Sequence, residues 1–180
     1  LPGLSGVSAV GNYATYAREG YQKNELIYAA IELRATSAAE PRIIGRRNLS
    51  ESRRRRVLAL LAENGISPLQ AGYQVRNLQE TVTDHPAVTL LNNPNPAMSR
   101  FQFWSQIIMH RDLAGNAYVW KERPSENAAP IGLWLLRPDR VRIIPENPHV
   151  VRAYRYSIGS QSIEFPARDV IHFKTRHPLD

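Results

Sequence analysis

The residues with the clearest potential for chemistry are two histidines near the end of the sequence. His172 and His177 lie close together, with Asp169 before the pair and Asp180 after it. Imidazole and carboxylate groups in such proximity could form an acid–base pair or part of a metal site. A hydrolase built on His172, His177 and Asp169 would lose its activity on His172→Ala. We favour a structural role for His172, which lies within a predicted strand, and a surface loop position for His177.

Sequence signatures of other catalytic sites do not occur in the chain. There is no Gly-x4-Gly-Lys-Ser/Thr phosphate loop, no His-Glu-x-x-His zinc motif and no Gly-x-Ser-x-Gly nucleophile turn. The absence of cysteine excludes a disulfide framework, a thiol nucleophile and Cys-ligated zinc. No apolar run approaches the roughly 20 residues that cross a bilayer. We therefore expect a protein that is not an enzyme, binds no cofactor or metal and makes no contact with a membrane.

Positive charge is in excess, with 23 lysine and arginine residues against 16 acidic ones and a formal net charge of +7. A basic surface favours polyanions through counterion release, although excess charge also serves solubility. The longest basic run is Arg53–Arg56, at the start of a predicted helix. Successive helical residues point about 100° apart, so four in a row cannot all line one groove. We favour a solvated helix start over a contact with DNA phosphates or with acidic groups of a neighbouring subunit.

A predicted strand near the end of the chain alternates arginine and tyrosine. Arg152 and Arg155 lie beside Tyr154 and Tyr156, which makes this strand the better candidate for an exposed basic and aromatic surface. The candidate basic contact surface therefore consists of Arg53, Arg54, Arg55, Arg56, Arg152 and Arg155.

Up to about residue 115 the chain is predicted to be mainly helical. One helix runs from Asn24, a suitable N-cap, to Ala39. It is apolar around so much of its circumference that we expect it to be well buried. A second helix covers about residues 50–64 and a short one residues 86–92, with a weak helical spacing between 66 and 82.

The best-specified helix begins after Ser99 and ends at Gly115. Ser99 and Gln102 have the spacing of a capping box, and glycine suits the left-handed position that follows a helix. The aromatic residues of this helix recur at helical spacing beside isoleucines, which predicts a core position rather than a stacking platform for single-stranded nucleic acid. The residues expected to face the core are Phe101, Phe103, Trp104, Ile107 and Ile108.

After about residue 116 the chain is predicted to form short strands separated by turns. The strand formers recur at 117–121, 131–136, 141–144, 151–158, 162–165 and 170–174. Helices followed by strands indicate an α+β fold, with N-terminal helices packed on a small, mainly antiparallel sheet arranged as a meander. We expect a flexible arm over residues 1–23, a mainly helical part over residues 24–115 and an antiparallel strand part over residues 116–180.

Several strings then follow one another in a specific order and spacing. They are His85-Pro86-Ala87-Val88-Thr89-Leu90-Leu91, Asn93-Pro94-Asn95-Pro96, a helix with Phe101, Phe103 and Trp104, Leu113-Ala114-Gly115-Asn116-Ala117-Tyr118-Val119, Leu136-Arg137-Pro138-Asp139-Arg140-Val141 and Asp169-Val170-Ile171-His172-Phe173. This combination resembles the HK97-type portal proteins of tailed bacteriophages. The resemblance covers about residues 24–177, whereas residues 45–83, with the arginine run, match no pattern of that family.

The resemblance implies a structural subunit of a portal ring, usually a dodecamer, at a unique capsid vertex. This stretch would form the peripheral wing, with the stem, clip and crown outside the chain. Such rings assemble in the bacterial host cytoplasm and remain in the virion, where double-stranded DNA passes through them without sequence specificity during packaging and ejection. They contact the terminase large subunit, the major capsid protein and a head-completion or adaptor protein.

The alternative to a portal subunit is a free-standing basic nucleic-acid-binding module. Such a module would bind DNA tightly as a monomer, with a steep dependence on salt. A portal subunit would bind weakly as a monomer and form rings.

Overall fold

The computed structural model describes residues 12–76, 78–147 and 149–175 of the chain. The chain divides into two compact units. Unit 1 combines the residues up to Arg42 with those from Asn92 onward, and unit 2 consists of Ile43–Leu91. The sequence had predicted no such insertion, because it assigned residues 24–115 to one mainly helical part.

Unit 1 begins with two helices joined by a short turn. α1 (Asn12–Thr15) continues into the π-helix η2 (Tyr16–Tyr21), and α2 (Glu25–Ala39) follows. Asn24 caps α2 as predicted, since its Oδ1 accepts hydrogen bonds from the backbone N–H groups of Leu26 and Ile27 at 3.1 and 3.2 Å. The flexible arm expected over residues 1–23 is therefore helical from residue 12 to residue 21, and its first eleven residues lie outside the described part of the chain.

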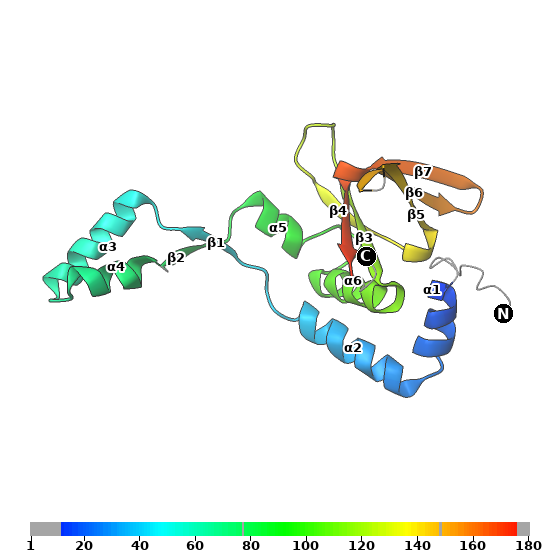
Figure 1. Ribbon diagram of the computed structural model, residues 1–180, viewed down its shortest axis with the longest axis horizontal. Helices are drawn as coiled ribbons and strands as arrows, with labels where there is room; N and C mark the ends of the chain where they lie inside the picture. Colours follow the sequence, from blue (N-terminus) through cyan, green and yellow to red (C-terminus); the bar gives the residue numbers. More distant parts are fainter. Residues whose placement is uncertain (1–11, 77, 148, 176–180) are drawn as a thin grey trace. The chain divides into compact units, whose positions relative to one another are not determined.

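The long helix α6 (Arg100–Ala114) packs against α2 at the centre of unit 1 (Figure 1). Its predicted capping box is confirmed, with Ser99 and Gln102 each bonding to the other's backbone, and Gly115 ends it with a φ of 70°. The buried residues of α6 are Phe103 and Ile107, and they face the buried side of α2. Phe101, predicted to face the core, is instead 42% exposed, because the covered side of the helix centres on Phe103.

The predicted well-buried state of α2 is wrong. Ile31, Ala35 and Ala39 are buried against α6, but Leu26 and Leu33 on the other side of the helix are 83% and 68% exposed. Within the described part of unit 1, the helix is covered from the α6 side, so only one of its apolar faces loses contact with solvent.

The strands of unit 1 form two sheets rather than the single meander that the sequence predicted. β3 (Asn116–Glu122), β4 (Gly132–Leu136) and β8 (Val170–Lys174) are arranged in the order β4-β3-β8. β5 (Val141–Asn147), β6 (Val150–Ile158) and β7 (Gln161–Pro166) form the second sheet in chain order. All pairs are antiparallel, which confirms the α+β class, and β8 returns to pair with β3.

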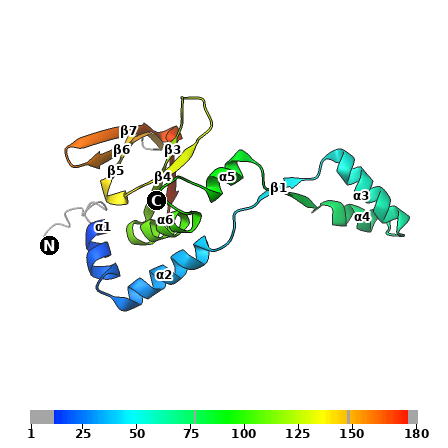
Figure 2. The ribbon, with the colours of Figure 1, turned by 180° about the vertical axis from the view of Figure 1, so that it is seen from behind.

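The two sheets share a hydrophobic core. It contains Tyr118, Leu136 and Val170 from the first sheet and Val141 and Tyr154 from the second. The opposite face of the first sheet lies toward α6, where Trp104 meets Phe173 edge to face at 6.5 Å. The main layers of unit 1 are therefore α2, α6, the β4-β3-β8 sheet and the β5-β6-β7 sheet, stacked in this order (Figures 1 and 2).

The Asn-Pro-rich segment before α6 has a structural role. Pro94 is fully buried, and its carbonyl accepts a hydrogen bond from the Leu133 N–H at 2.7 Å. The Asn95 side-chain amide donates to the Leu133 carbonyl at 2.8 Å, while its Oδ1 accepts from the Ala97 N–H at 3.0 Å. This segment therefore extends the edge of β4, because it satisfies backbone groups that the strand would leave open.

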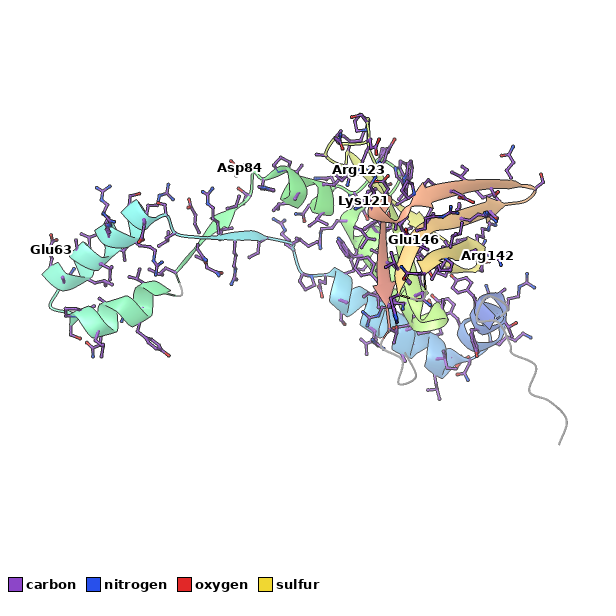
Figure 3. All side chains as sticks on the ribbon, turned by 45° about the horizontal axis from the view of Figure 1, so that its top comes forward. Glu63, Asp84, Lys121, Arg123, Arg142 and Glu146 are labelled. Atoms are coloured by element: carbon purple, nitrogen blue, oxygen red, sulfur yellow. The ribbon has the colours of Figure 1, made fainter. Side chains whose placement is uncertain are left out.

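Unit 2 is a helical hairpin carried on a two-stranded ribbon. β1 (Gly45–Asn48) pairs antiparallel with β2 (Gln79–Val82), and α3 (Glu51–Glu63) and α4 (Pro68–Arg76) lie between them, with Glu63 at the α3 end nearest α4 (Figure 3). α5 (Pro86–Asn92) follows the ribbon. Ala71 and Val75 of α4 form the buried side of the hairpin. The sequence did not predict the two strands, because they are short, polar and paired across more than thirty residues.

Candidate functional site

His172, the residue with the strongest predicted chemistry, lies on β8 between the two sheets. The β3–β8 pairing places it opposite Tyr118, and the two rings stack with centroids 4.4 Å apart. Its Nε2 lies 2.8 Å from Asn116 Oδ1, and its Nδ1 lies 3.3 Å from the Tyr154 hydroxyl. In the neutral ring, Nε2–H donates to Asn116 and the tyrosine hydroxyl donates to Nδ1. Both ring nitrogens therefore have hydrogen-bond partners.

The electrostatics of this cluster keep its members uncharged. Burial, assisted by the charge of Lys174, lowers the pKa of His172 to about 4. Burial and the neighbouring Tyr154 raise the pKa of Tyr118 to about 12. At neutral pH the cluster is thus a set of neutral hydrogen-bonded groups, as the structural interpretation of His172 predicts.

The acidic partner proposed for a hydrolase is engaged elsewhere. Asp169 pairs with Arg123 at 2.9 Å and lies 3.9 Å from Arg168. Figure 3 shows Arg123 at the end of β3, close to Lys121. His177 and Asp180 lie outside the described residues. Within residues 12–76, 78–147 and 149–175, no group of three or more histidine, aspartate or glutamate side chains is placed to hold a metal ion.

The arginine run of unit 2 begins α3, as the sequence predicted. Arg53 pairs with Glu80 of β2, and Arg47 approaches the same carboxylate at 3.4 Å. The Arg53 guanidinium, with a contribution from Arg47, lowers the pKa of Glu80. Arg55 and Arg56 are exposed. No ion pair to Arg54, Arg55 or Arg56 is found among the described residues.

The two arginines of β6 differ in their partners. Arg155 pairs with Glu164 on β7, with its Nε 3.0 Å from Oε1. Arg152 is exposed and lies at a register shift between β5 and β6, where Ala153 pairs with Ile144 and Val151 pairs with Pro145. Tyr154 is buried and Tyr156 is half-buried against the shared core, so the predicted exposed basic and aromatic surface is wrong. Tyr154 and Tyr156 are two residues apart on the strand, so their side chains lie on the same face of the sheet, and this face is the one that packs against the core.

Sequence reasoning missed a polar cluster near the end of α6. His110 Nδ1, Arg111 Nε and Asp112 Oδ2 are buried without a hydrogen-bond partner among the described residues. The Asp112 side chain is only one-tenth exposed, and its other oxygen lies 3.4 Å from Arg34. The available signal was the run of three consecutive polar residues, His110, Arg111 and Asp112, in the last turn and a half of the helix.

Two of these residues line a pocket of about 380 Å³ beside α2. The lining residues are Ala30, Ile31, Arg34, Arg111, Asp112, Gly115 and Thr175. On the other side of α6, His110 meets the Tyr13 ring edge to face at 6.0 Å. Burial, assisted by Arg137, lowers the pKa of His110 to about 4. The unpartnered Asp112 Oδ2 and Arg111 Nε atoms are themselves buried, so they lie beneath the wall of this pocket.

Comparison with known families identifies the family of the chain. The profile described as phage portal protein matches residues 53–180, which is more than half of the sequence. The chain belongs to the phage portal protein family. The match begins in α3, so it includes the helical hairpin, where the sequence strings alone had shown no pattern of the family.

One relative is an uncharacterized protein of Rickettsia felis, 33% identical over 107 residues, which are 56% of this chain and 27% of the relative. Two similar solved structures are the neck of an empty gene transfer agent particle computed with C6 symmetry and the virion of the native particle. Their TM-scores are 0.66 and 0.65, with 22% and 21% identity over 94% of this chain. A native neck computed with C12 symmetry scores 0.64. The chain spans 38% or less of the length of these solved chains, and the likeness shows a shared fold.

Proposed function

We propose that the chain is the wing portion of a portal ring, a homo-oligomeric conduit for double-stranded DNA at one capsid vertex. The observation that supports this most strongly is the family match over residues 53–180. A fold shared over 94% of the chain with proteins of phage-like necks and virions supports it further. The C12 symmetry of one similar neck supports a ring of twelve copies.

The charge distribution is compatible with a conduit. A channel through which DNA slides should not hold phosphates tightly, because strong contacts would resist movement. Arg47, Arg53 and Arg155 are each paired with a glutamate, which reduces the charge available to DNA. The available cations on the predicted contact surface are Arg54, Arg55, Arg56 and Arg152. We infer that they contribute weak contacts without sequence specificity.

The remaining parts of the proposal concern the whole protein. The ring would assemble in the host cytoplasm and remain in the virion, with the stem, clip and crown formed by sequence outside this chain. It would contact the terminase large subunit, the major capsid protein and a head-completion or adaptor protein. Its role is structural, without a catalytic centre or cofactor, and the motor that moves the DNA is a separate protein.

Electron microscopy of the full-length protein tests the proposal directly. Negative staining and native mass spectrometry should show homogeneous rings with a central hole and a fixed copy number. A protein that stays monomeric under every assembly condition while it turns over a substrate would overturn the proposal. A monomer that binds DNA tightly would favour the nucleic-acid-binding alternative.

The arginines provide the comparison that separates these two functions. For a portal wing, DNA affinity of the chain should remain in the non-specific range of about 10⁻⁴ to 10⁻⁶ M at physiological salt. Replacing Arg54, Arg55 and Arg56 by alanine should weaken it slightly and equally for all sequences. The control replaces two arginines that are already paired with Glu80, Arg47 and Arg53. A nanomolar affinity that collapses in the first variant would support the alternative.

A further inference from the structure

Few residues of unit 2 are buried. Among those whose burial is described, only Ala71 and Val75 are buried, and both belong to α4. α3 contains no buried residue. α3 has 13 residues and α4 has 9, lengths at which an isolated helix is marginal in water, and a two-stranded ribbon adds little stability. We therefore expect the hairpin to complete its packing against a further surface.

α3 turns one side toward α4 and leaves the other side open. Its half-buried side chains recur at helical spacing and mark the side toward α4. They are Arg54, Val57, Leu58 and Leu61. With about 100° between successive residues, Arg56 and Leu60 lie on the opposite side. Leu60 is 52% exposed, Arg56 is exposed, and no ion pair to Arg56 is found among the described residues. We call Arg56 and Leu60 the α3 pair.

α4 is open on the side away from α3. Ala71 and Val75 form its buried side, whereas Leu69 and Tyr73 lie opposite them and are 88% and 76% exposed. We call Leu69 and Tyr73 the α4 pair. A hollow of about 460 Å³ lies along this face. Its lining residues are all uncharged and comprise Ile66, Leu69, Gln70, Tyr73 and Gln74. The hairpin thus has two different open faces, one with an available cation and one with an exposed aromatic ring.

We propose that the hairpins of unit 2 stack head to tail around the ring, with the α3 pair of one copy on the α4 pair of the next. This inference rests on the proposed function, because a ring gives each hairpin one neighbour on either side. Leu60 would enter the hollow beside Leu69. The Arg56 guanidinium would lie on the Tyr73 ring in a cation–π contact.

The spacing of the two pairs fits this stacking. Four residues separate the members of each pair, so each pair spans about 6 Å along its helix. α3 runs toward the loop that joins the two helices, and α4 runs away from it (Figures 1 and 2). In hairpins stacked in the same orientation, α3 of one copy is antiparallel to α4 of the next. Leu60 and Leu69 are the members nearer the loop, so both contacts form in one register.

Two-fold arrangements of the hairpins are less favourable. Packing α3 on α3 of another copy would bring Arg55 and Arg56 of the two copies together, and like charges repel. Packing α4 on α4 is electrically neutral, but it would leave α3 without any buried residue. A head-to-tail contact covers both helices, and it repeats around a rotation until the ring closes.

Introduced cysteines test the contact in the full-length protein, because these 180 residues contain none. Other cysteines of that protein would first be replaced. Oxidised rings of Leu60→Cys/Leu69→Cys should give a ladder of disulfide-linked multimers on a denaturing gel, because a disulfide requires Cα atoms within about 7 Å. The two positions lie on opposite sides of one hairpin, so a link within one copy is not expected.

Controls separate this contact from random collisions. Each single cysteine variant should stay monomeric on the gel, and rings assembled from a mixture of the two should stop at dimers. The matched pair Leu60→Cys/Ile131→Cys should give no ladder, since Ile131 is 63% exposed in unit 1.

Hydrogen exchange gives a second readout that does not depend on cross-linking. The amides of α3 should exchange at least about tenfold more slowly in rings than in unassembled subunits, because opening α3 would then break a contact between copies. The amides of α6 should change little, since its buried face already packs on α2. Arg56→Glu should remove the added protection of α3, and Tyr73→Phe should keep it because phenylalanine retains the aromatic face.

Rings without the ladder, or equal exchange of α3 in rings and in unassembled subunits, would overturn the stacking and leave the proposed function standing. Dimers from Leu69→Cys alone would indicate a two-fold α4 contact and would overturn the stacking as well. Absence of rings from the unmodified protein would overturn the proposed function itself.

Discussion

Arg100 shows how one side chain can fix the end of a helix. It is the first residue of α6, and its guanidinium donates to the carbonyls of Ala39, Glu40 and Pro41 at 2.9, 3.1 and 2.6 Å. These are carbonyls at the end of α2 that lack intrahelical partners. A cation at this position also suits the negative end of the helix dipole. The contact joins α2 to α6 just before the chain leaves unit 1.

Replacing Arg100 by alanine should lower the free energy of unfolding by about 2 kcal/mol, because three charge-assisted hydrogen bonds are lost, of which the bond to the Ala39 carbonyl is partly buried. Arg100→Lys should recover only part of this, since an ammonium group cannot reproduce the planar fork. Chemical denaturation measures both. Arg42→Ala, at an exposed position, should change the stability by less than about 0.5 kcal/mol. Equal losses for Arg100→Ala and Arg42→Ala would contradict the capping role.

His110 makes stability depend on pH. Its pKa is about 4 in the folded chain and about 6.5 when unfolded, so the unfolded state binds the proton more readily. Its contribution is fully present above pH 6.5, is lost as pH falls from 6.5 to 4, and changes no further below that. The full effect is at most roughly 3 kcal/mol.

The comparison of wild type with His110→Gln isolates this contribution from the carboxylates that titrate in the same range. Denaturation midpoints measured between pH 7 and pH 4 should fall less steeply in the variant. His172 has the same direction of shift and remains in both proteins. Parallel profiles for the two proteins would show that His110 is not held neutral by burial.

At the scale of elements, two glycines with different backbones should respond in opposite ways to the same substitution. Gly115 follows α6 with a φ of 70°, and Gly72 lies inside α4. A Cβ added at either position meets no atom within 4 Å, so crowding does not distinguish them. The difference lies in the backbone conformation alone.

Gly115→Ala should destabilise unit 1 by about 1 kcal/mol, because an L side chain strains the left-handed conformation. Gly72→Ala should stabilise unit 2 by about 0.5 to 1 kcal/mol, because alanine favours the helix. Thermal unfolding followed by circular dichroism measures both changes. Gly115→Asn serves as the control, since asparagine tolerates this conformation and should lose less. A stabilising Gly115→Ala would contradict the described helix end.

At the scale of the whole molecule, unit 2 is an insertion between two segments of unit 1. Gly45 and Val82 are cross-strand partners in the β1–β2 ribbon, so the two connections lie side by side. Unit 1 has its own shared core between two sheets, to which unit 2 contributes no residue. Such an arrangement is typical of an inserted unit that a domain can lose without unfolding.

Excision of residues 46–81, with Asn-Gly in their place, should therefore leave unit 1 folded. The replacement forms a two-residue hairpin turn between Gly45 and Val82. The three tryptophans, Trp104, Trp120 and Trp134, all belong to unit 1, so their fluorescence reports its unfolding alone. We expect the denaturation midpoint to stay the same. Loss of a cooperative fluorescence transition would show that unit 1 depends on the insertion.

The sequence by itself determined the local features of this protein. The caps at Asn24 and Ser99, the helix end at Gly115 and the positions of the later strands follow from interactions within a few residues, and the structure confirms them. The ordered strings also indicated the family, and the profile match confirms it. His172 could be singled out as a notable side chain, but its partners Asn116 and Tyr154 could not be inferred from its neighbours.

The tertiary structure alone decided which segments and faces meet. Pairing of β8 with β3, and of β1 with β2, joins residues far apart in the chain. The exposed side of α2, the inward tyrosines of β6 and the unpartnered Asp112 oxygen depend on which element covers which face. Hydrophobic periodicity indicates that one face of an element is apolar. Whether that face is buried depends on a second surface, which another part of the chain or another molecule must supply.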